Sequence, residues 1–475
     1  MRKIWLCLFL MLVVTGCSKN YMAEREYYQA QKVLDSVKST DVEAFGAKAY
    51  DPAVAAFQKV VDKYPGTPKA LESLFVVSNL CLQQEKYDQA IETLRKVTVN
   101  FPDSKQQSAE ALFRIGAIYD KKEEWGKAES IYWEVAEYHP LEQRGLQAPI
   151  EVIMHYAKIN YPDAQKRAFQ QALDQYKKTL DRIGPIQASM EVRNYVGVAY
   201  SVMGDLKAAR KEWVGIANDF HDLPAAASAL IPAAEASLRL QQPRAAVALY
   251  EQYLKRVTKG VTVGQMNVRL GMLYHRLGEY AKARNCYEKA AATFGPGSVQ
   301  MADVELLIAK SYQAQGNWDE ARKRYHALEE KYPDSIAAMQ VPLMIAAYFQ
   351  DLGDKATGER MLDNAIAKYK KIAADNPGTN LAQIAQRLLN DAFVRKGDWT
   401  QVMAQLDESM KRAPNAEEKG KLLLMKAMLV ETRVKDKQLA LKLYNEFITD
   451  YANHPLVEIA KRHQELLAKG QPVGR

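Results

Sequence analysis

The fold is decided by a stretch of sequence that recurs in the second half of the chain. Residues 271–296 read GMLYHRLGEYAKARNCYEKAAATFGP, and residues 309–333 read AKSYQAQGNWDEARKRYHALEEKYP. A small residue, a Tyr, an Ala and a second Tyr recur at equal offsets: Gly271, Tyr274, Ala283 and Tyr287, then Ala309, Tyr312, Ala321 and Tyr325. Apolar residues spaced three and four apart lie on one face of a helix. Each stretch therefore predicts two amphipathic helices joined by a turn.

The same pattern recurs upstream and, in weaker form, through most of the chain. Good copies contain Gly116, Tyr119, Ala128 and Tyr132, and then Gly197, Tyr200, Ala209 and Trp213. Small residues allow two helices to approach closely, and Gly at the turn ends the first helix of each pair. A closing Pro, such as Pro140 or Pro333, lacks an N–H and cannot continue the second helix.

These residues resemble the tetratricopeptide repeat, and about ten copies cover residues 45–455. The resemblance implies an all-α fold, a right-handed superhelical solenoid of helical hairpins, with a concave groove lined by the first helix of each pair. A lone hairpin cannot bury its apolar face, whereas stacked hairpins can. Closing segments NFPDS (100–104) and KYPDS (331–335) resemble the subtype found in BamD-like and Tol-Pal-associated periplasmic lipoproteins. Ser after the Pro is placed to cap the next helix.

The N-terminus carries a processing signal. Arg2 and Lys3 precede an apolar run, residues 4–14, which is shorter than the roughly 20 residues that a membrane-spanning helix needs. The run ends in Val14-Thr15-Gly16-Cys17, which resembles the bacterial lipobox. The resemblance implies cleavage between Gly16 and Cys17 and lipidation, including palmitate, at Cys17. An ordinary secretory signal followed by a chance Cys is the alternative.

The address follows from the same resemblance. Ser18 follows Cys17, and the absence of Asp at this position favours the outer membrane. We therefore expect a protein anchored by lipid to the periplasmic face of the outer membrane. The helical pattern begins near Tyr21, close to the anchor.

The expected organisation has six parts. These are a signal peptide (1–16), a lipidated N-terminus and first helix (17–45), an N-terminal repeat arm (46–140), an irregular helical stretch (141–185), a C-terminal repeat arm (186–455), and a capping helix with a tail (456–475). Pro149, Pro162 and Pro185 interrupt the irregular stretch, which is either a degenerate repeat or a bend between the arms.

Composition and motifs argue against several classes of function. The 475 residues carry a mild net charge of +8 without a run of five like charges, so a nucleic-acid footprint is missing. Phosphate-loop, nucleophile-elbow and zinc-protease motifs are absent from the sequence. Cys81, Cys286 and the seven His residues lack metal-ligand spacing. We predict no enzyme, no cofactor and no metal; a cryptic catalytic site near His155 is the least favoured alternative.

Function is therefore expected on the groove. The family pattern places these side chains on first helices: Phe75, Asn79, Phe113, Arg114, Asn194, Arg269, Met272, His275 and Lys310. We predict a protein–protein interaction scaffold for envelope proteins, serving outer-membrane protein assembly, Tol-Pal and peptidoglycan coordination, or polysaccharide or pilus export. The alternative is a module that binds a glycan or peptidoglycan directly. Both readings leave the partner residues to be placed by structure.

Overall fold

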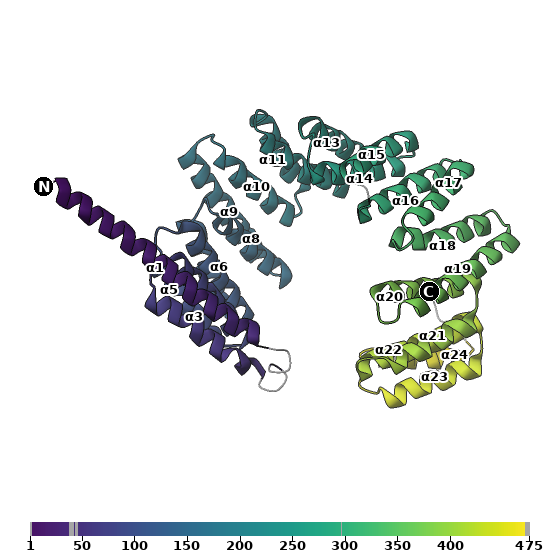
Figure 1. Cartoon of the computed structure of the whole chain (residues 1–475). Helices are drawn as coiled ribbons and strands as arrows, with labels where there is room; N and C mark the ends of the chain where they lie inside the picture. Colours follow the sequence, from purple (N-terminus) through teal and green to yellow (C-terminus); the bar gives the residue numbers. More distant parts are fainter. Residues whose placement is uncertain (1, 38–41, 43–45, 296, 471–475) are drawn as a thin grey trace. The chain divides into compact units, whose positions relative to one another are not determined.

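The computed structural model describes residues 2–37, 42, 46–295 and 297–470, and for residues 2–18 and 299 it describes the backbone alone. Within these ranges the regular elements are all helices, which confirms the predicted all-α fold of stacked hairpins (Figure 1). The contacts divide the chain into two compact units, Met1–Thr258 (unit 1) and Lys259–Arg475 (unit 2). No helix among the described residues is long and apolar enough to cross a membrane.

Unit 1 consists of α1 (Arg2–Ser36), a 3-10 turn (Gly46–Tyr50), α3 (Asp51–Lys63), α4 (Pro68–Gln83), α5 (Tyr87–Asn100), α6 (Lys105–Lys121), α7 (Trp125–Tyr138), α8 (Gln143–Lys158), α9 (Pro162–Ile183), α10 (Ala188–Val202), α11 (Leu206–Asp219), a second 3-10 turn (Pro224–Ala229), α12 (Leu230–Arg239) and α13 (Pro243–Arg256). Helices that follow one another in sequence pack against one another.

Unit 2 consists of α14 (Val261–Arg276), α15 (Tyr280–Thr293), α16 (Val299–Ala314), α17 (Trp318–Lys331), α18 (Ile336–Asp351), α19 (Lys355–Asp375), α20 (Asn380–Lys396), α21 (Trp399–Lys411), α22 (Ala416–Leu429), a π-helical turn (Val430–Val434), α23 (Lys437–Asp450) and α24 (Val457–Ala468). Helix α24 packs on α23 at the end of the stack. The tail residues 471–475 lie outside the described residues.

Close approach of two helices defines each hairpin, as the repeat pattern predicts. A Cβ added at Gly271 would lie 2.5 Å from the Tyr287 ring, and one added at Gly197 would lie 2.5 Å from the Trp213 ring. The Tyr287 side chain is almost fully buried. Only glycine fits at these two positions without moving an aromatic ring, so the register of the repeats follows from sterics.

Residues after the closing Pro begin the next helix. Thr67, Ser335 and Thr379 each accept a hydrogen bond from a backbone N–H in the first turn of the helix that they precede. The Ser335 bond is the cap predicted from residues 331–335, and Thr67 and Thr379 make the same bond after Pro65 and Pro377. Ser104 precedes α6 without such a side-chain bond.

The stretch 141–185 is a helical hairpin that continues the stack. Helices α8 and α9 pack on one another, and α8 also contacts α6 and α10. Pro162 is tolerated because it stands in the first turn of α9, where its missing N–H needs no partner. The division between the two units lies after Thr258, so it differs from the interruption that the prolines indicate.

Helix α1 starts earlier than the sequence pattern indicates. Its backbone is helical from Arg2, whereas the amphipathic pattern begins near Tyr21. From residue 19 onward α1 packs on α3 and α4: Ala23 and Ala30 are buried, and the Tyr27 ring meets Phe57 edge-on. For Gly16 and Cys17 the structure describes the backbone alone, so the lipobox stays a prediction.

Candidate partner-binding face

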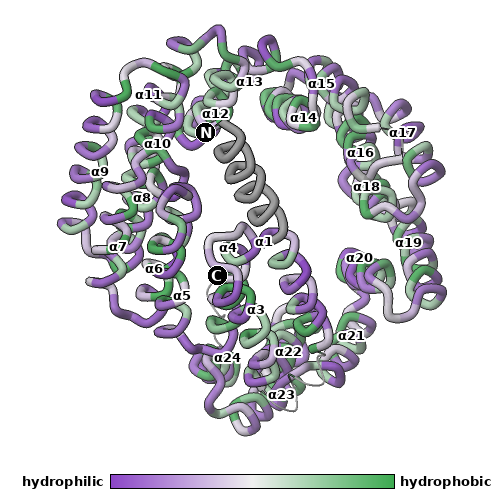
Figure 2. The backbone as a smooth tube through the Cα atoms, turned by 60° about the vertical axis from the view of Figure 1, so that its left-hand side comes forward, coloured by the Kyte–Doolittle hydropathy of each residue, from purple (hydrophilic) through white to green (hydrophobic). Residues whose placement is uncertain are grey.

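The first helices of adjacent hairpins form one face of each unit. Helix α8 contacts α6 and α10, and α18 contacts α16 and α20; comparable contacts between neighbouring second helices are absent from the described part of the chain. In each unit the first helices gather on one side of the stack and the second helices on the other (Figure 2). Because the first helices lie closer together, each stack curves toward them. We call this side the first-helix face.

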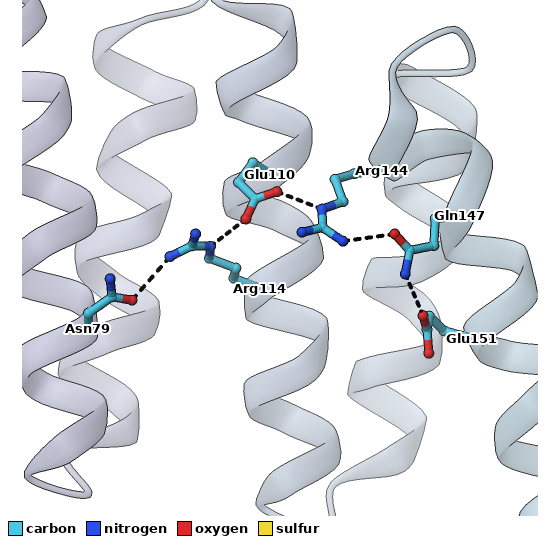
Figure 3. A network of polar contacts seen from close by, with 6 residues as sticks. All are labelled: Asn79, Glu110, Arg114, Arg144, Gln147 and Glu151. Atoms are coloured by element: carbon cyan, nitrogen blue, oxygen red, sulfur yellow. Dashed lines mark hydrogen bonds and ion pairs between the residues drawn. The ribbon is translucent and has the colours of Figure 1, made fainter. Parts of the chain in front are cut away.

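In unit 1 the first-helix face carries a chain of polar contacts, which we call the polar ladder (Figure 3). Glu110 on α6 stands at its centre. Its two carboxylate oxygens accept hydrogen bonds from Nε of Arg114 and Nε of Arg144, each at 2.6 Å. Because Arg144 lies on α8, this carboxylate joins two hairpins.

The ladder extends to both sides of Glu110. Arg114 Nη1 donates to Asn79 Oδ1 on α4 at 3.1 Å. On the other side, Arg144 Nη1 donates to Gln147, and Gln147 donates to Glu151, both at 2.8 Å. Three consecutive first helices are therefore linked by side chains that satisfy one another.

Two guanidinium groups of the ladder also lie over aromatic rings. Arg114 sits 5.1 Å from the centroid of Phe75, and Arg144 sits 4.6 Å from that of Phe113. Cation–π contact and ion pairing together hold both groups in fixed orientations. Phe113 is only 8% exposed, since Arg144 and Tyr132 cover its ring. It contributes packing, whereas Phe75 is half-buried and lines the adjoining cleft.

The electrostatics of the ladder favour an ionised Glu110. Burial alone raises the pKa of this carboxyl, but hydrogen bonds from Arg144 and Arg114 outweigh burial, so its pKa lies below the usual value. A cleft of about 270 Å³ opens beside it, lined by Phe75, Gln106, Gln107, Glu110, Arg114, Glu142, Gln143 and Arg144. Every side chain in its lining except Phe75 is polar.

The remaining predicted groove residue of unit 1, Asn194, is used within its own hairpin. Its Oδ1 accepts a hydrogen bond from Trp213 Nε1 at 3.1 Å. The bond satisfies the indole of a buried Trp. The structure thus brings Phe75, Asn79 and Arg114 together but places Asn194 in a packing role.

In unit 2 the predicted residues lie on α14 and α16. Met272 is 53% exposed, and Arg269 is exposed on the same helix. The His275 ring meets Tyr280 edge-on, and its Nε2 is buried without a hydrogen-bond partner among the described residues. Burial lowers the pKa of Lys310 on α16. These side chains lie on the two first helices α14 and α16.

The sequence reasoning missed an apolar cleft between α18 and α20. It measures about 550 Å³ and is lined by Leu343, Met344, Ala347, Leu388, Val394, Gln340, Asp391 and Arg395. Val394 is 42% exposed although it is apolar. The segment VPLMIAAYF (341–349) is apolar on every side of its helix. Its pattern therefore indicates a buried helix and does not show which side of α18 stays exposed.

Comparison with known proteins identifies the repeats. Tetratricopeptide-repeat models match residues 43–105 and residues 262–330. The chain contains tetratricopeptide repeats. No curated protein sequence matches it significantly.

Solved structures that contain helical repeats are similar to the chain at low identity. Yeast Tom70 is 14% identical, with 93% of this chain and 99% of that chain covered and a TM-score of 0.37. Pseudomonas aeruginosa pilF is 17% identical, with 50% and 97% covered and a TM-score of 0.31. MamA is 18% identical, with 38% and 97% covered and a TM-score of 0.29.

Tetratricopeptide repeats bind protein partners, so this chain is an interaction protein by fold. Two tryptophans of the described residues stack on neighbouring rings: Trp125 on His155 and Trp318 on Tyr348, with ring centroids 3.3 and 3.6 Å apart. A neighbouring ring therefore covers one face of each of these two indoles. His155, the residue of the cryptic-site alternative, stacks on Trp125, and its Nδ1 lies 3.3 Å from Asp120 Oδ1.

Side chains that bind metals do not cluster in the part of the chain that the structure describes. The described residues contain no group of three or more His, Cys, Asp or Glu positioned to hold a metal ion. Cys81 and Cys286 are buried free thiols in different units, and burial raises the pKa of the Cys81 thiol.

Proposed function

We propose that this protein is a lipid-anchored scaffold that holds envelope proteins on its first-helix faces. The observation that carries the proposal is the pair of unlike surfaces on one array: a polar ladder on α4, α6 and α8, and an open apolar cleft between α18 and α20. Two chemically different surfaces suit two different partners, or two segments of one partner. A scaffold gains from this because it brings bound proteins together.

The anchor in this proposal is Cys17, and the address is the periplasmic face of the outer membrane. The motif Val14-Thr15-Gly16-Cys17 behind a basic start and a short apolar run supports it. Several acyl chains on one terminus hold a protein stably where a single chain does not. The machine served is an assembly or export system of the envelope: outer-membrane protein assembly, Tol-Pal and peptidoglycan coordination, or polysaccharide or pilus export.

Site-specific photo-crosslinking in intact cells tests the scaffold. A photoreactive amino acid at Met272, on the first-helix face of unit 2, is compared with one at Lys289, exposed on the second helix α15. We expect an envelope protein joined at Met272 and absent at Lys289. Equal products at both positions, or products made of peptidoglycan or polysaccharide alone, would overturn the scaffold and favour direct glycan binding.

The anchor is tested separately. Cys17→Ala is expected to yield a folded protein that no longer fractionates with the outer membrane. Mass spectrometry of the N-terminal peptide of the unaltered protein should show acyl chains on Cys17. An unmodified peptide that begins elsewhere would contradict the lipobox reading and leave the scaffold role intact.

A further inference from the structure

Helix α1 carries a stripe of alternating aromatic and basic residues on its exposed side. Tyr21, Arg25, Tyr28 and Lys32 are spaced four, three and four residues apart, which places them within about 60° of one another around a helix. All four are exposed, with Tyr21 at 67% and Tyr28 at 58%. We call this set the α1 stripe.

The opposite side of α1 is committed to the fold. Ala23 and Ala30 are buried against α3 and α4, about half a turn away from the stripe. Packing thus fixes which side of α1 faces outward. The stripe is therefore a rigid surface of unit 1, whatever it meets.

Acidic side chains of α1 are drawn away from the stripe or stand at its edges. Glu26 pairs with Lys59 on α3 at 2.5 Å. Glu24 is exposed, and its charge makes the smallest of several contributions to the raised pKa of Lys69 on α4. Asp35, at the far end of α1, accepts a hydrogen bond from Gln31 at 3.0 Å. Arg25 and Lys32 are left as the charges at the centre of the exposed side.

Tyr beside Arg and Lys is the residue pattern of a membrane–water interface. Tyrosine rings sit at the level of lipid headgroups, and basic side chains reach the phosphates. In the stripe the Lys32 ammonium lies 4.7 Å from the centroid of the Tyr28 ring, so both side chains point to the same side. The stripe begins four residues after Cys17, where the proposed anchor would enter the bilayer.

We propose that the α1 stripe lies on the phospholipid headgroups of the membrane and so fixes the orientation of unit 1. The inference rests on the proposed anchor, since acylated Cys17 brings α1 to the surface. A lipid on Cys17 alone would let the protein rotate freely about its attachment point. With the stripe in contact with the headgroups as well, unit 1 would keep one defined orientation relative to the bilayer.

The test measures how close α1 lies to headgroups in the intact, acylated protein. Gln29→Cys places an exposed thiol beside the stripe, while Cys81 and Cys286 are buried and Cys17 carries lipid. A fluorophore on this thiol is quenched by lipids that carry a headgroup quencher. The protein is reconstituted into phosphatidylethanolamine vesicles with or without phosphatidylglycerol. We expect strong quenching, greatest with the anionic lipid.

The deciding variant is Arg25→Glu with Lys32→Glu. Each basic residue near an anionic surface favours the bound form about fivefold, so this pair should shift the equilibrium toward the detached state by about 30-fold or more. The matched control is Lys166→Glu with Lys177→Glu, which makes the same change in charge at exposed positions of α9. The control should stay quenched, and both variants should melt like the parent.

The outcomes separate the two proposals. Missing acyl chains on Cys17 would overturn the anchor, and with it the contact that depends on it. An acylated protein that stays with the vesicles but is not quenched would overturn the stripe alone. Equal loss of quenching in the α9 control would do the same, because the effect would then follow from total charge.

Discussion

The first-helix faces of the two units are built from equivalent helices, but their side chains make different contacts. In unit 1, Glu110, Arg114 and Arg144 bind one another across neighbouring hairpins, so the polar groups of this face are largely satisfied within the protein. In unit 2, α18 and α20 leave Leu343, Leu388 and Val394 around an open cleft. Equivalent helices therefore give unit 1 a face whose side chains are hydrogen-bonded to one another, and unit 2 a face with apolar surface that a partner can cover.

The difference has a physical consequence for binding. A partner on unit 1 must compete with existing hydrogen bonds, so it gains orientation more than affinity. A partner in the unit 2 cleft removes apolar area from water, which is the larger source of affinity. We therefore expect the cleft between α18 and α20 to provide most of the affinity for a partner, and the polar ladder of unit 1 to provide most of the specificity.

The largest effect is expected from substitutions at the glycine that packs on an aromatic ring within a hairpin, a contact that both units contain. Gly271→Leu would drive a side chain into the Tyr287 ring, and Gly116→Leu would strike Tyr132, 2.8 Å from the added Cβ. Both should lower the free energy of unfolding of their own unit by about 3 kcal/mol. Hydrogen exchange resolved along the chain, combined with thermal melting, assigns the loss to one unit.

The control for overpacking is Gly126→Leu on α7, where an added Cβ meets nothing within 4 Å. This variant should match the parent or exceed it slightly, because Leu favours a helix over Gly by about 0.8 kcal/mol. An unchanged melting curve for Gly271→Leu would mean that the hairpins are not packed as described.

The second perturbation opens the polar ladder. Glu110→Ala leaves Arg114 and Arg144 without their shared carboxylate and should cost unit 1 about 1 kcal/mol, a modest value because both arginines are partly exposed. Glu92→Ala removes an exposed pair with Lys96 on α5 and should change stability by less than about 0.5 kcal/mol. If the two variants cost the same, the ladder is no stronger than an ordinary surface pair.

Acid titration checks the same carboxylate. The pKa of Glu110 is lower in the folded state than in the unfolded chain, so its contribution is complete above the ordinary value of about 4.3 and is lost as the pH falls through the folded-state pKa. The stability gap between the parent and Glu110→Gln should therefore narrow as the pH falls below the ordinary value, and it should close once the pH lies below the folded-state pKa. A gap that persists there would show that Glu110 acts through packing alone.

The third perturbation asks whether the cleft binds. Val394→Asp adds a carboxylate to the apolar cleft at an exposed position, so stability should change by less than about 0.5 kcal/mol while capture of the crosslinked partner falls about tenfold. Asn79→Asp adds the same group on the first-helix face of unit 1, where Arg114 already donates to it. Equal losses for the two variants would contradict the division between anchoring and selecting faces.

Local sequence pattern predicts the hairpins because each rests on contacts within about 16 residues, such as Gly271 with Tyr287. It also places Phe75, Asn79 and Arg114 on first helices, where the structure brings the three side chains into contact. It does not predict Glu110 and Arg144 as partners, since their bond joins hairpins 34 residues apart and Arg144 lies where no repeat aligned. The burial of Phe113 depends on that same neighbour.

The smallest expected effect concerns Lys310, a predicted partner residue of unit 2. Burial lowers its pKa in the folded state, so the charged form is less favourable there than in the unfolded chain. Lys310→Met should therefore stabilise unit 2 at neutral pH by about 0.5 kcal/mol, and the gain should vanish as the pH rises toward the unfolded value of about 10.4.

Lys323 is the opposite case: its hydrogen bond with Glu320 raises its pKa, so Lys323→Met should not stabilise. If Lys310→Met destabilises instead, the ammonium has a partner in solution, and the face of unit 2 is more polar than its cleft implies.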